Sequence, residues 1–206
     1  MFIRGGSEPG GAPSRTLADD AMDRYADGDA AAFSTLYEEL APRLLRFAAR
    51  RLQSHVAAED VVQQTFLHIH SARARFTRGA AVLPWAYAIA RRLAIDLHRR
   101  HGREDLRADP VAVHREPSSP EAPDEQVHRM RSEAALRGDL GRLPPALREA
   151  FELLKLEGLS VAECAEVLGI TRGMVKIRAH RATAALRHAQ LRRELDPRAS
   201  EREVST

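Results

Sequence analysis

Apolar residues recur at helical spacing along most of the chain and divide it into two halves. In the first half this period predicts helices over residues 29–52, from Ser54 or His55 to about residue 70, and over 85–100. In the second half it predicts helices over residues 135–143, 145–157, 160–168 and 171–186. The pattern therefore predicts an all-α protein made of two small helical domains.

Breaks in the pattern locate the expected turns. Pro42 interrupts the first segment, so we expect a kinked helix or two abutting helices there. Residues 71–84 are expected to form a loop. In the helix that follows, the residues expected to face the core are Ala86, Ile89, Leu93 and Leu97. In the helix over residues 135–143, the expected apolar stripe is Ala135, Leu136, Leu140 and Leu143.

Residues 158–181 have the pattern of a helix-turn-helix. Ser160 and Glu163 form a capping box at the start of a short helix, and Gly169 suits the left-handed conformation that ends it. Thr171 then caps a second helix. Cys164 falls on the inward side of the first helix, where a small thiol packs well, so we interpret it as a core residue.

The second helix of this motif has two different sides. Its inward stripe is Val175, Ala179, Ala182 and Leu186. The opposite side, after the cap Thr171, carries Arg172, Gly173, Lys176, Ile177, His180 and Arg181. Such residues can bind phosphates and base edges when a helix enters a major groove. The alternative is a helical hairpin whose basic face is merely solvated. The helix-turn-helix interpretation is favoured, because a simple hairpin does not require the caps, the glycine turn and the one-sided charge to occur together.

Two surfaces of the first half carry candidate chemistry. Glu59, Asp60, Gln63 and Gln64 form an acidic and amide patch that could accept hydrogen bonds from arginines of a partner protein. Acidic residues near a helix start are at least as well explained by the helix dipole. The second surface is a basic loop and helix suited to a nucleic-acid backbone, with Arg75, Phe76, Arg78, Arg91, Arg92 and Arg99. Trp85 is better explained as a core residue than as a base-stacking one.

Composition sets the boundaries between these parts. The 206 residues, 44% hydrophobic and 30% charged, suit one or two globular domains. Two segments are rich in Gly, Pro, Ser or acidic residues, one at the start of the chain and one between its two halves. Their composition predicts a disordered lead over 1–16 and a flexible linker over 101–130. The helical domains are then expected at 17–100 and 131–190, with a charged tail over 191–206.

Several kinds of chemistry are not expected. One cysteine excludes an internal disulfide framework, and the chain has neither a phosphate-binding glycine loop nor a nucleophile elbow. The histidines are better explained as surface residues than as metal ligands. No apolar run suits membrane insertion. We therefore expect a cytoplasmic protein that is not an enzyme and has no catalytic residue, cofactor or metal.

Three short motifs, in this order and spacing, give the chain a family resemblance. They are residues 58–67 (AEDVVQQTFL), the run from Pro84-Trp85 to Asp96, and Leu143-Pro144-Pro145 followed by Glu157-Gly158-Leu159-Ser160. Together they resemble bacterial extracytoplasmic-function sigma factors of the sigma-70 family, over residues 29–100 and 133–186.

This resemblance implies promoter-specific initiation of transcription, in a stress or envelope response. It implies that Glu59, Asp60, Gln63 and Gln64 bind core RNA polymerase, which reverses the preference for the helix-dipole explanation. It implies that the basic loop and helix bind the minus-ten promoter element and that the helix beginning at Thr171 binds the minus-thirty-five element. It also implies an anti-sigma factor as a further partner. Arg92, Met174 and Ile177 replace the family's more usual Asn, Thr and Ser, so we expect a promoter preference of its own.

Two other classes of function fit parts of the pattern. A stand-alone helix-turn-helix regulator would use its first half to sense a ligand or to dimerise, and would bind a symmetric site tightly without polymerase. A helical enzyme with a histidine and carboxylate site is a more distant alternative, because no convergent set of such residues is present in the sequence.

Overall fold

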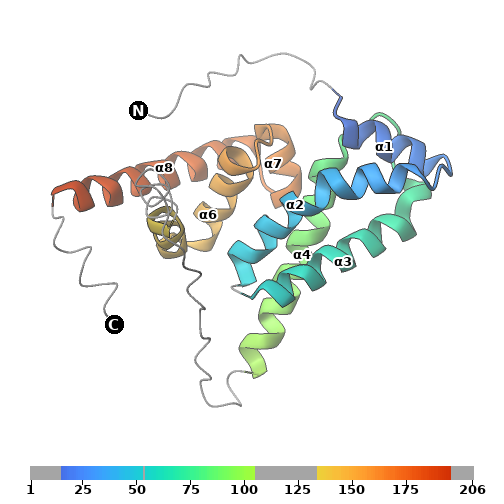
Figure 1. Ribbon diagram of the computed structural model, residues 1–206. Helices are drawn as coiled ribbons and strands as arrows, with labels where there is room; N and C mark the ends of the chain where they lie inside the picture. Colours follow the sequence, from blue (N-terminus) through green and yellow to red (C-terminus); the bar gives the residue numbers. More distant parts are fainter. Residues whose placement is uncertain (1–14, 53, 105–133, 196–206) are drawn as a thin grey trace, which may run out of the picture.

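The computed structural model describes residues 15–52, 54–104 and 134–195, and within these ranges all regular structure is helical. The first half contains α1 (Leu17–Ala26), α2 (Ala32–Leu52), α3 (His55–Ala72), a 3-10 turn η1 (Arg73–Arg75) and α4 (Val82–Glu104). The second half contains a helical segment at 134–142, α6 (Pro145–Phe151), a π-helical turn η2 (Glu152–Leu156), α7 (Val161–Leu168) and α8 (Arg172–Leu195) (Figure 1). The all-α prediction is confirmed. Most of the predicted lead and linker lies outside the described residues.

Helix α1 is the element that the hydrophobic pattern did not predict. Thr16 and Asp19 form a capping box at its start. Its buried residues are Ala18, Asp19, Ala21, Met22 and Tyr25. Because two of these five are alanines and one is an acid, the apolar signal of this helix is weak.

Helix α2 passes through Pro42 as one helix. Proline removes the hydrogen bond that would reach the carbonyl four residues earlier, on Glu38. Both residues are exposed, so water can satisfy that carbonyl. The buried side holds Leu36, Leu40, Leu44 and Phe47 and is undisturbed.

The loop predicted over residues 71–84 is wrong in extent. Helix α3 continues to Ala72, η1 follows, and α4 begins at Val82, so the irregular segment is only residues 76–81. Pro84 lies in the first turn of α4, where a backbone N–H has no partner within the helix in any case. Helical pattern alone could not distinguish such a proline from a helix boundary.

The four residues of α4 that were predicted to face the core all pack against it: Ala86 is buried, and Ile89, Leu93 and Leu97 are half-buried. Tyr87, Ala90 and Ala94, which the prediction did not include, are also buried. The reason is tertiary: α4 packs against α2 and α3 and also against α7 of the second half. One continuous apolar core therefore includes residues of both halves.

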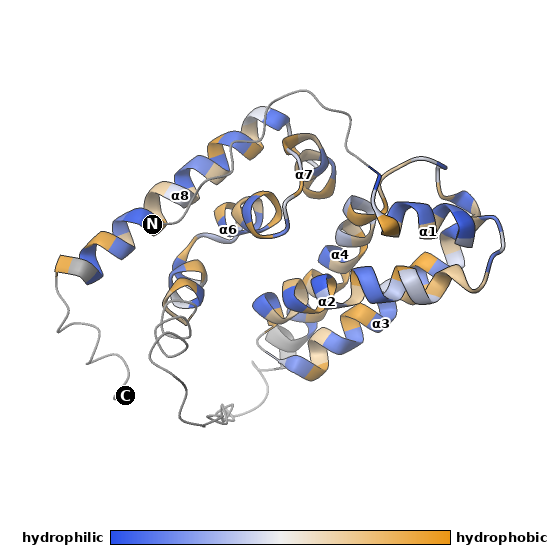
Figure 2. Cartoon of the chain, turned by 45° about the horizontal axis from the view of Figure 1, so that its top comes forward, coloured by the Kyte–Doolittle hydropathy of each residue, from blue (hydrophilic) through white to orange (hydrophobic). Residues whose placement is uncertain are grey.

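The second half confirms most of its predicted core. Leu140 and Leu143 pack with Ala182, but Leu136 is 39% exposed, so its place in the predicted stripe is wrong. Helix α8 continues to Leu195, beyond the predicted domain boundary at 190, and Arg193 pairs with the buried Asp139 at 2.6 Å. Hydrophilic and hydrophobic residues alternate along α8, as expected of a helix with one buried side (Figure 2).

Cys164 is fully buried on α7, as predicted for a core residue. Burial, with a smaller contribution from Glu163, raises the pKa of its thiol to about 12. Because only the thiolate reacts, we expect a disulfide reagent at pH 8 to modify native Cys164 at least about 100-fold more slowly than the urea-unfolded chain. Absorbance of the released chromophore gives both rates, and equal rates would contradict the buried assignment.

Candidate nucleic-acid interface

The local structure of residues 158–181 matches the helix-turn-helix prediction. Ser160 Oγ accepts from Glu163 N at 3.2 Å, and the Glu163 carboxylate accepts from Ser160 N at 2.7 Å. Gly169 has a φ of 64°, the left-handed conformation that ends α7. Thr171 Oγ1 accepts from Met174 N at 3.2 Å, which caps α8. These local contacts fix where α8 begins.

The two sides of α8 are those that the sequence predicts. Val175, Ala179 and Ala182 are buried and Leu186 is half-buried, with α7 and α6 packed on this side. All seven predicted DNA-contact residues on this element are exposed: Thr171, Arg172, Gly173, Lys176, Ile177, His180 and Arg181. The buried stripe thus turns a basic surface, with the apolar side chains of Met174 and Ile177, toward solvent.

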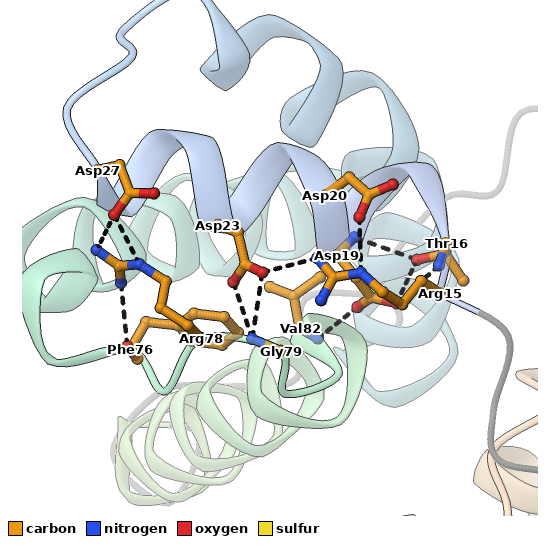
Figure 3. A network of polar contacts seen from close by, with 10 residues as sticks. All are labelled: Arg15, Thr16, Asp19, Asp20, Asp23, Asp27, Phe76, Arg78, Gly79 and Val82. Atoms are coloured by element: carbon orange, nitrogen blue, oxygen red, sulfur yellow. Dashed lines mark hydrogen bonds and ion pairs between the residues drawn. The ribbon is translucent and has the colours of Figure 1, made fainter.

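Acidic residues on α1 hold the loop at 76–81 in place. Asp19 Oδ1 accepts from Val82 N at 2.8 Å, and both Asp23 oxygens accept from Gly79 N at 3.2 Å (Figure 3). Sequence reasoning did not single out these carboxylates. Their spacing was a usable signal, because Asp19, Asp23 and Asp27 follow one another at four-residue intervals and share one side of α1.

Asp23 also pairs with Arg15 at 2.7 Å. Burial acts to raise the pKa of Asp23, but bonds from Arg15 and Gly79 outweigh it and keep that pKa below its ordinary value. A carboxyl with a lowered pKa stabilises the folded state above its unfolded pKa and loses this effect as the pH falls. The hold on the loop is therefore intact at neutral pH.

The predicted minus-ten residues occupy three kinds of environment. Arg75, Arg92 and Arg99 are exposed. Phe76 is half-buried with its ring centroid 5.2 Å from that of Trp85, which packs against the core as expected. The remaining two are paired: Arg78 Nε and Nη2 lie 2.8 and 2.6 Å from Asp27, and Arg91 lies 3.0 Å from Glu149 of the second half. The sequence did not indicate either pairing.

A groove of about 940 Å³ opens between α1, α2 and α3. Four aromatic rings, those of Tyr25, Phe33, Tyr37 and Phe66, line it. They contact one another, with centroids 4.7 Å apart for Tyr37 and Phe66 and 5.4 Å for Tyr25 and Phe33. Tyr37 is 47% exposed. An apolar surface of this kind, open to solvent, is typical of a binding site.

The predicted polymerase-binding residues lie at this groove. Glu59, Asp60 and Gln63 line it, and Gln64 is exposed beside Gln63 on α3. Glu59 contacts His55 at 3.3 Å, but the side chains of Asp60, Gln63 and Gln64 make no hydrogen bond to any residue within the described ranges. The groove thus brings aromatic side chains together with exposed hydrogen-bond acceptors that have no partner within the described ranges.

Comparison with known proteins decides the family. Sigma-70 region 2 matches residues 36–104, and Sigma-70, region 4 matches residues 135–186. The RNA polymerase sigma factor CarQ of Myxococcus xanthus is 36% identical over 173 residues, which cover 81% of this chain and 93% of CarQ. The ECF RNA polymerase sigma factor SigE of Mycolicibacterium smegmatis is 33% identical over 183 residues, covering 87% and 69% of the two chains. The chain belongs to the ECF sigma factors of the sigma-70 family.

Solved structures agree with this assignment. CnrH, in complex with the cytosolic domain of CnrY, aligns with a TM-score of 0.62 and 25% identity over 84% of this chain and 96% of CnrH. RpoE of Bartonella quintana, crystallised with the anti-sigma factor NepR, aligns with a TM-score of 0.61 and 25% identity over 77% and 96% of the two chains. We call α1 to α4 region 2 and residues 134–195 region 4 from here on.

The family assignment establishes the activity. The chain is an RNA polymerase sigma factor, which directs promoter-specific transcription initiation of the kind that serves stress and envelope responses. Sigma factors are, as a family, regulators of initiation. Within the described ranges no helix is long and apolar enough to cross a bilayer, and no group of three or more potential ligands could hold a metal ion.

Proposed function

We propose that the sigma factor divides promoter recognition among three surfaces. The groove and the side chains of Glu59, Asp60, Gln63 and Gln64 bind core RNA polymerase. The loop at 76–81 and α4 bind the minus-ten element, and α8 binds the minus-thirty-five element. The observation that carries this proposal is α8, where all seven residues assigned to DNA are exposed while the stripe beside them is buried.

The groove suits an amphipathic helix of the polymerase. Its aromatic rings would bury the apolar side of such a helix, and the carboxylate of Asp60 with the amides of Gln63 and Gln64 would accept hydrogen bonds from arginines along its edge. Docking fixes the orientation of the sigma factor before it meets DNA. Free sigma factor is therefore expected to bind its promoter more weakly than the holoenzyme does.

Strand separation at the minus-ten element requires no nucleotide hydrolysis by this chain. Unpairing and unstacking cost a few kcal/mol per base, and binding of an extruded base by the loop, with phosphate contacts from the arginines of α4, can offset that cost. Arg75, Arg92 and Arg99 are exposed for this purpose. The backbone of the loop is fixed by α1, so little ordering is needed when a base binds. We accordingly propose that the chain is a non-enzymatic binding protein without a cofactor.

An anti-sigma factor is the expected regulatory partner. The structurally similar RpoE was crystallised with the anti-sigma factor NepR. A protein that bound the groove would compete directly with polymerase. A role at promoters places the chain in the bacterial cytoplasm, associated with the nucleoid through polymerase.

Runoff transcription tests the proposed function. Bacterial core polymerase is incubated with a pool of genomic promoter fragments, with and without the sigma factor. We expect specific transcripts only when the sigma factor is present, and their start sites identify its promoter. Inactive polymerase together with a symmetric footprint of the protein alone would instead support a stand-alone regulator.

The Lys176→Ala variant tests the assignment of α8. Lys176 is exposed on the DNA side of α8, and we assign it to a phosphate. We expect weaker binding to the identified promoter at low salt, and a slope of log affinity against log salt that is shallower by roughly one unit. The measurement is fluorescence anisotropy of labelled duplex with the sigma factor at several salt concentrations. An unchanged slope would remove Lys176 from the backbone contacts.

A further inference from the structure

Two exposed apolar side chains, Met174 and Ile177, lie within the basic side of α8. Met174 is 41% exposed and Ile177 is 48% exposed. They are three positions apart, so they are neighbours on one face of the helix, and we call them the apolar pair. Single exposed apolar residues are common on protein surfaces and need no explanation. This pair differs because its two members adjoin on the surface assigned to DNA.

Ile177 lies opposite the residues that anchor α8 to the rest of region 4. At 3.6 residues per turn it is about 160° round the helix from Val175 and from Ala179, which are 0% and 4% exposed. Its chain neighbours Lys176 and Arg178 fall about 100° to either side of it. At this level of the helix the centre of the exposed side is therefore apolar, and cationic side chains flank it.

The first turn of α8 fixes where the apolar pair lies. Thr171 Oγ1 accepts from the backbone N of Met174 at 3.2 Å, and the Thr171 carbonyl accepts from Val175 N at 3.1 Å. Gly173 follows in the same turn, and a Cβ built onto it would meet Thr171 Oγ1 at 3.9 Å, an ordinary van der Waals distance. The packing of α8 therefore does not require glycine here. The missing side chain leaves room for DNA to approach the helix beside the apolar pair.

The major groove of DNA presents one apolar group to such a surface, the C5 methyl of thymine. The other groups that distinguish the base pairs there are hydrogen-bond donors and acceptors. Isoleucine and methionine cannot pair strongly with those groups, so contact with them would cost hydration without return. Contact with a methyl group instead removes apolar surface from water on both molecules. The cations that flank the pair suit the phosphates, which carry no sequence information.

We propose that Met174 and Ile177 are specificity-determining residues that read thymine methyl groups in the minus-thirty-five element. This inference rests on the proposed role of α8 in binding that element, and it adds the chemical group that is read. The element must then contain at least one A·T pair whose thymine methyl faces α8. A minus-thirty-five element without any A·T pair would overturn the inference.

Deoxyuridine gives a test that leaves the protein unchanged, because it pairs as thymine does but lacks the C5 methyl. Holoenzyme made from core polymerase and the full chain is titrated with the labelled promoter identified by runoff transcription. Each thymine of the minus-thirty-five element is replaced in turn by deoxyuridine. We expect at least one replacement to weaken binding about three- to fourfold, the factor that corresponds to one methyl group removed from an apolar contact. Replacement of a thymine between the two promoter elements should not change the affinity.

Coupling between protein and DNA identifies the side chain that reads the methyl. Ile177→Ser and Met174→Ser each remove an exposed apolar side chain, so circular dichroism should show an unchanged fold. In the variant that lacks the contacting side chain, the deoxyuridine effect should fall below about 1.5-fold, because the methyl has lost its partner. Leu191→Ser is the matched control. Leu191 is 54% exposed on the same helix but about 21 Å further along its axis, so this variant should keep the full deoxyuridine effect.

The outcomes separate this inference from the proposed role of α8. If deoxyuridine has no effect while Lys176→Ala gives a shallower salt slope, α8 binds the element without reading methyl groups, and the inference is wrong. An equal deoxyuridine effect in wild type and in both serine variants would also overturn it, because another residue would then read the methyl. If Lys176→Ala and both serine variants bind the promoter as wild type does, the role of α8 itself fails.

Discussion

Replacing Asp60 by Arg and Gln63 by Ala should weaken binding to core RNA polymerase by roughly 100-fold or more, because the change reverses a charge in the groove and removes an acceptor beside it. Both side chains are exposed and make no hydrogen bond within the described part of the chain. The fold should therefore be unaffected. The measurement is fluorescence anisotropy of labelled sigma factor titrated with core polymerase.

The control for this variant reverses a charge elsewhere. Asp20→Arg changes an exposed acid on α1 that pairs with Arg15 and lies outside the groove. It should bind polymerase within about twofold of wild type, and the thermal transitions of both variants, followed by circular dichroism, should match that of wild type. If Asp60→Arg with Gln63→Ala bound as tightly as Asp20→Arg, the groove would not be the polymerase site.

Replacing Phe47 by alanine should lower the free energy of unfolding by about 3–5 kcal/mol, the usual cost of truncating a fully buried aromatic residue. Phe47 on α2 is completely buried. Its ring lies 5.1 Å from that of Tyr87 on α4, and the Arg51 guanidinium lies 4.8 Å from the ring centroid. The change therefore removes apolar contacts, an aromatic pair and the surface that supports Arg51. Urea unfolding followed by circular dichroism measures the loss.

Leu17→Ala is the matched control for Phe47→Ala. Leu17 is 67% exposed at the start of α1, and its truncation should change the free energy of unfolding by no more than about 0.5 kcal/mol. Equal effects of the two substitutions would contradict the placement of Phe47 at the centre of region 2.

Local sequence determined the helix-turn-helix and much of region 2. The Ser160 and Glu163 capping box, the left-handed Gly169 and the Thr171 cap act between residues a few positions apart, so their geometry is encoded where they stand. Val62, Phe66 and Ile69 on α3, and Val175 and Ala179 on α8, similarly follow from helical period. These features position all seven residues assigned to the minus-thirty-five element and the four assigned to polymerase.

Weak or ambiguous local signals account for the errors within region 2. The buried side of α1 is partly alanine, so its period was not distinct. Pro84 sits where proline is tolerated in a helix, although the sequence pattern predicts the end of a loop there. Met22 and Tyr25 became recognisable as core residues only because α2 covers them.

The sequence by itself determined most of the helices, the exposed basic side of α8, the acceptors at Asp60 and Gln63, and the family to which the chain belongs. Only the tertiary structure decided that Tyr25, Phe33, Tyr37 and Phe66 form one groove, that α1 holds the loop at 76–81, and that Arg91 meets Glu149. Helical periodicity and caps depend on neighbours within about one or two turns, so sequence reports them directly. A groove or an ion pair between residues 58 positions apart depends on how separate helices pack, and no local pattern specifies that arrangement.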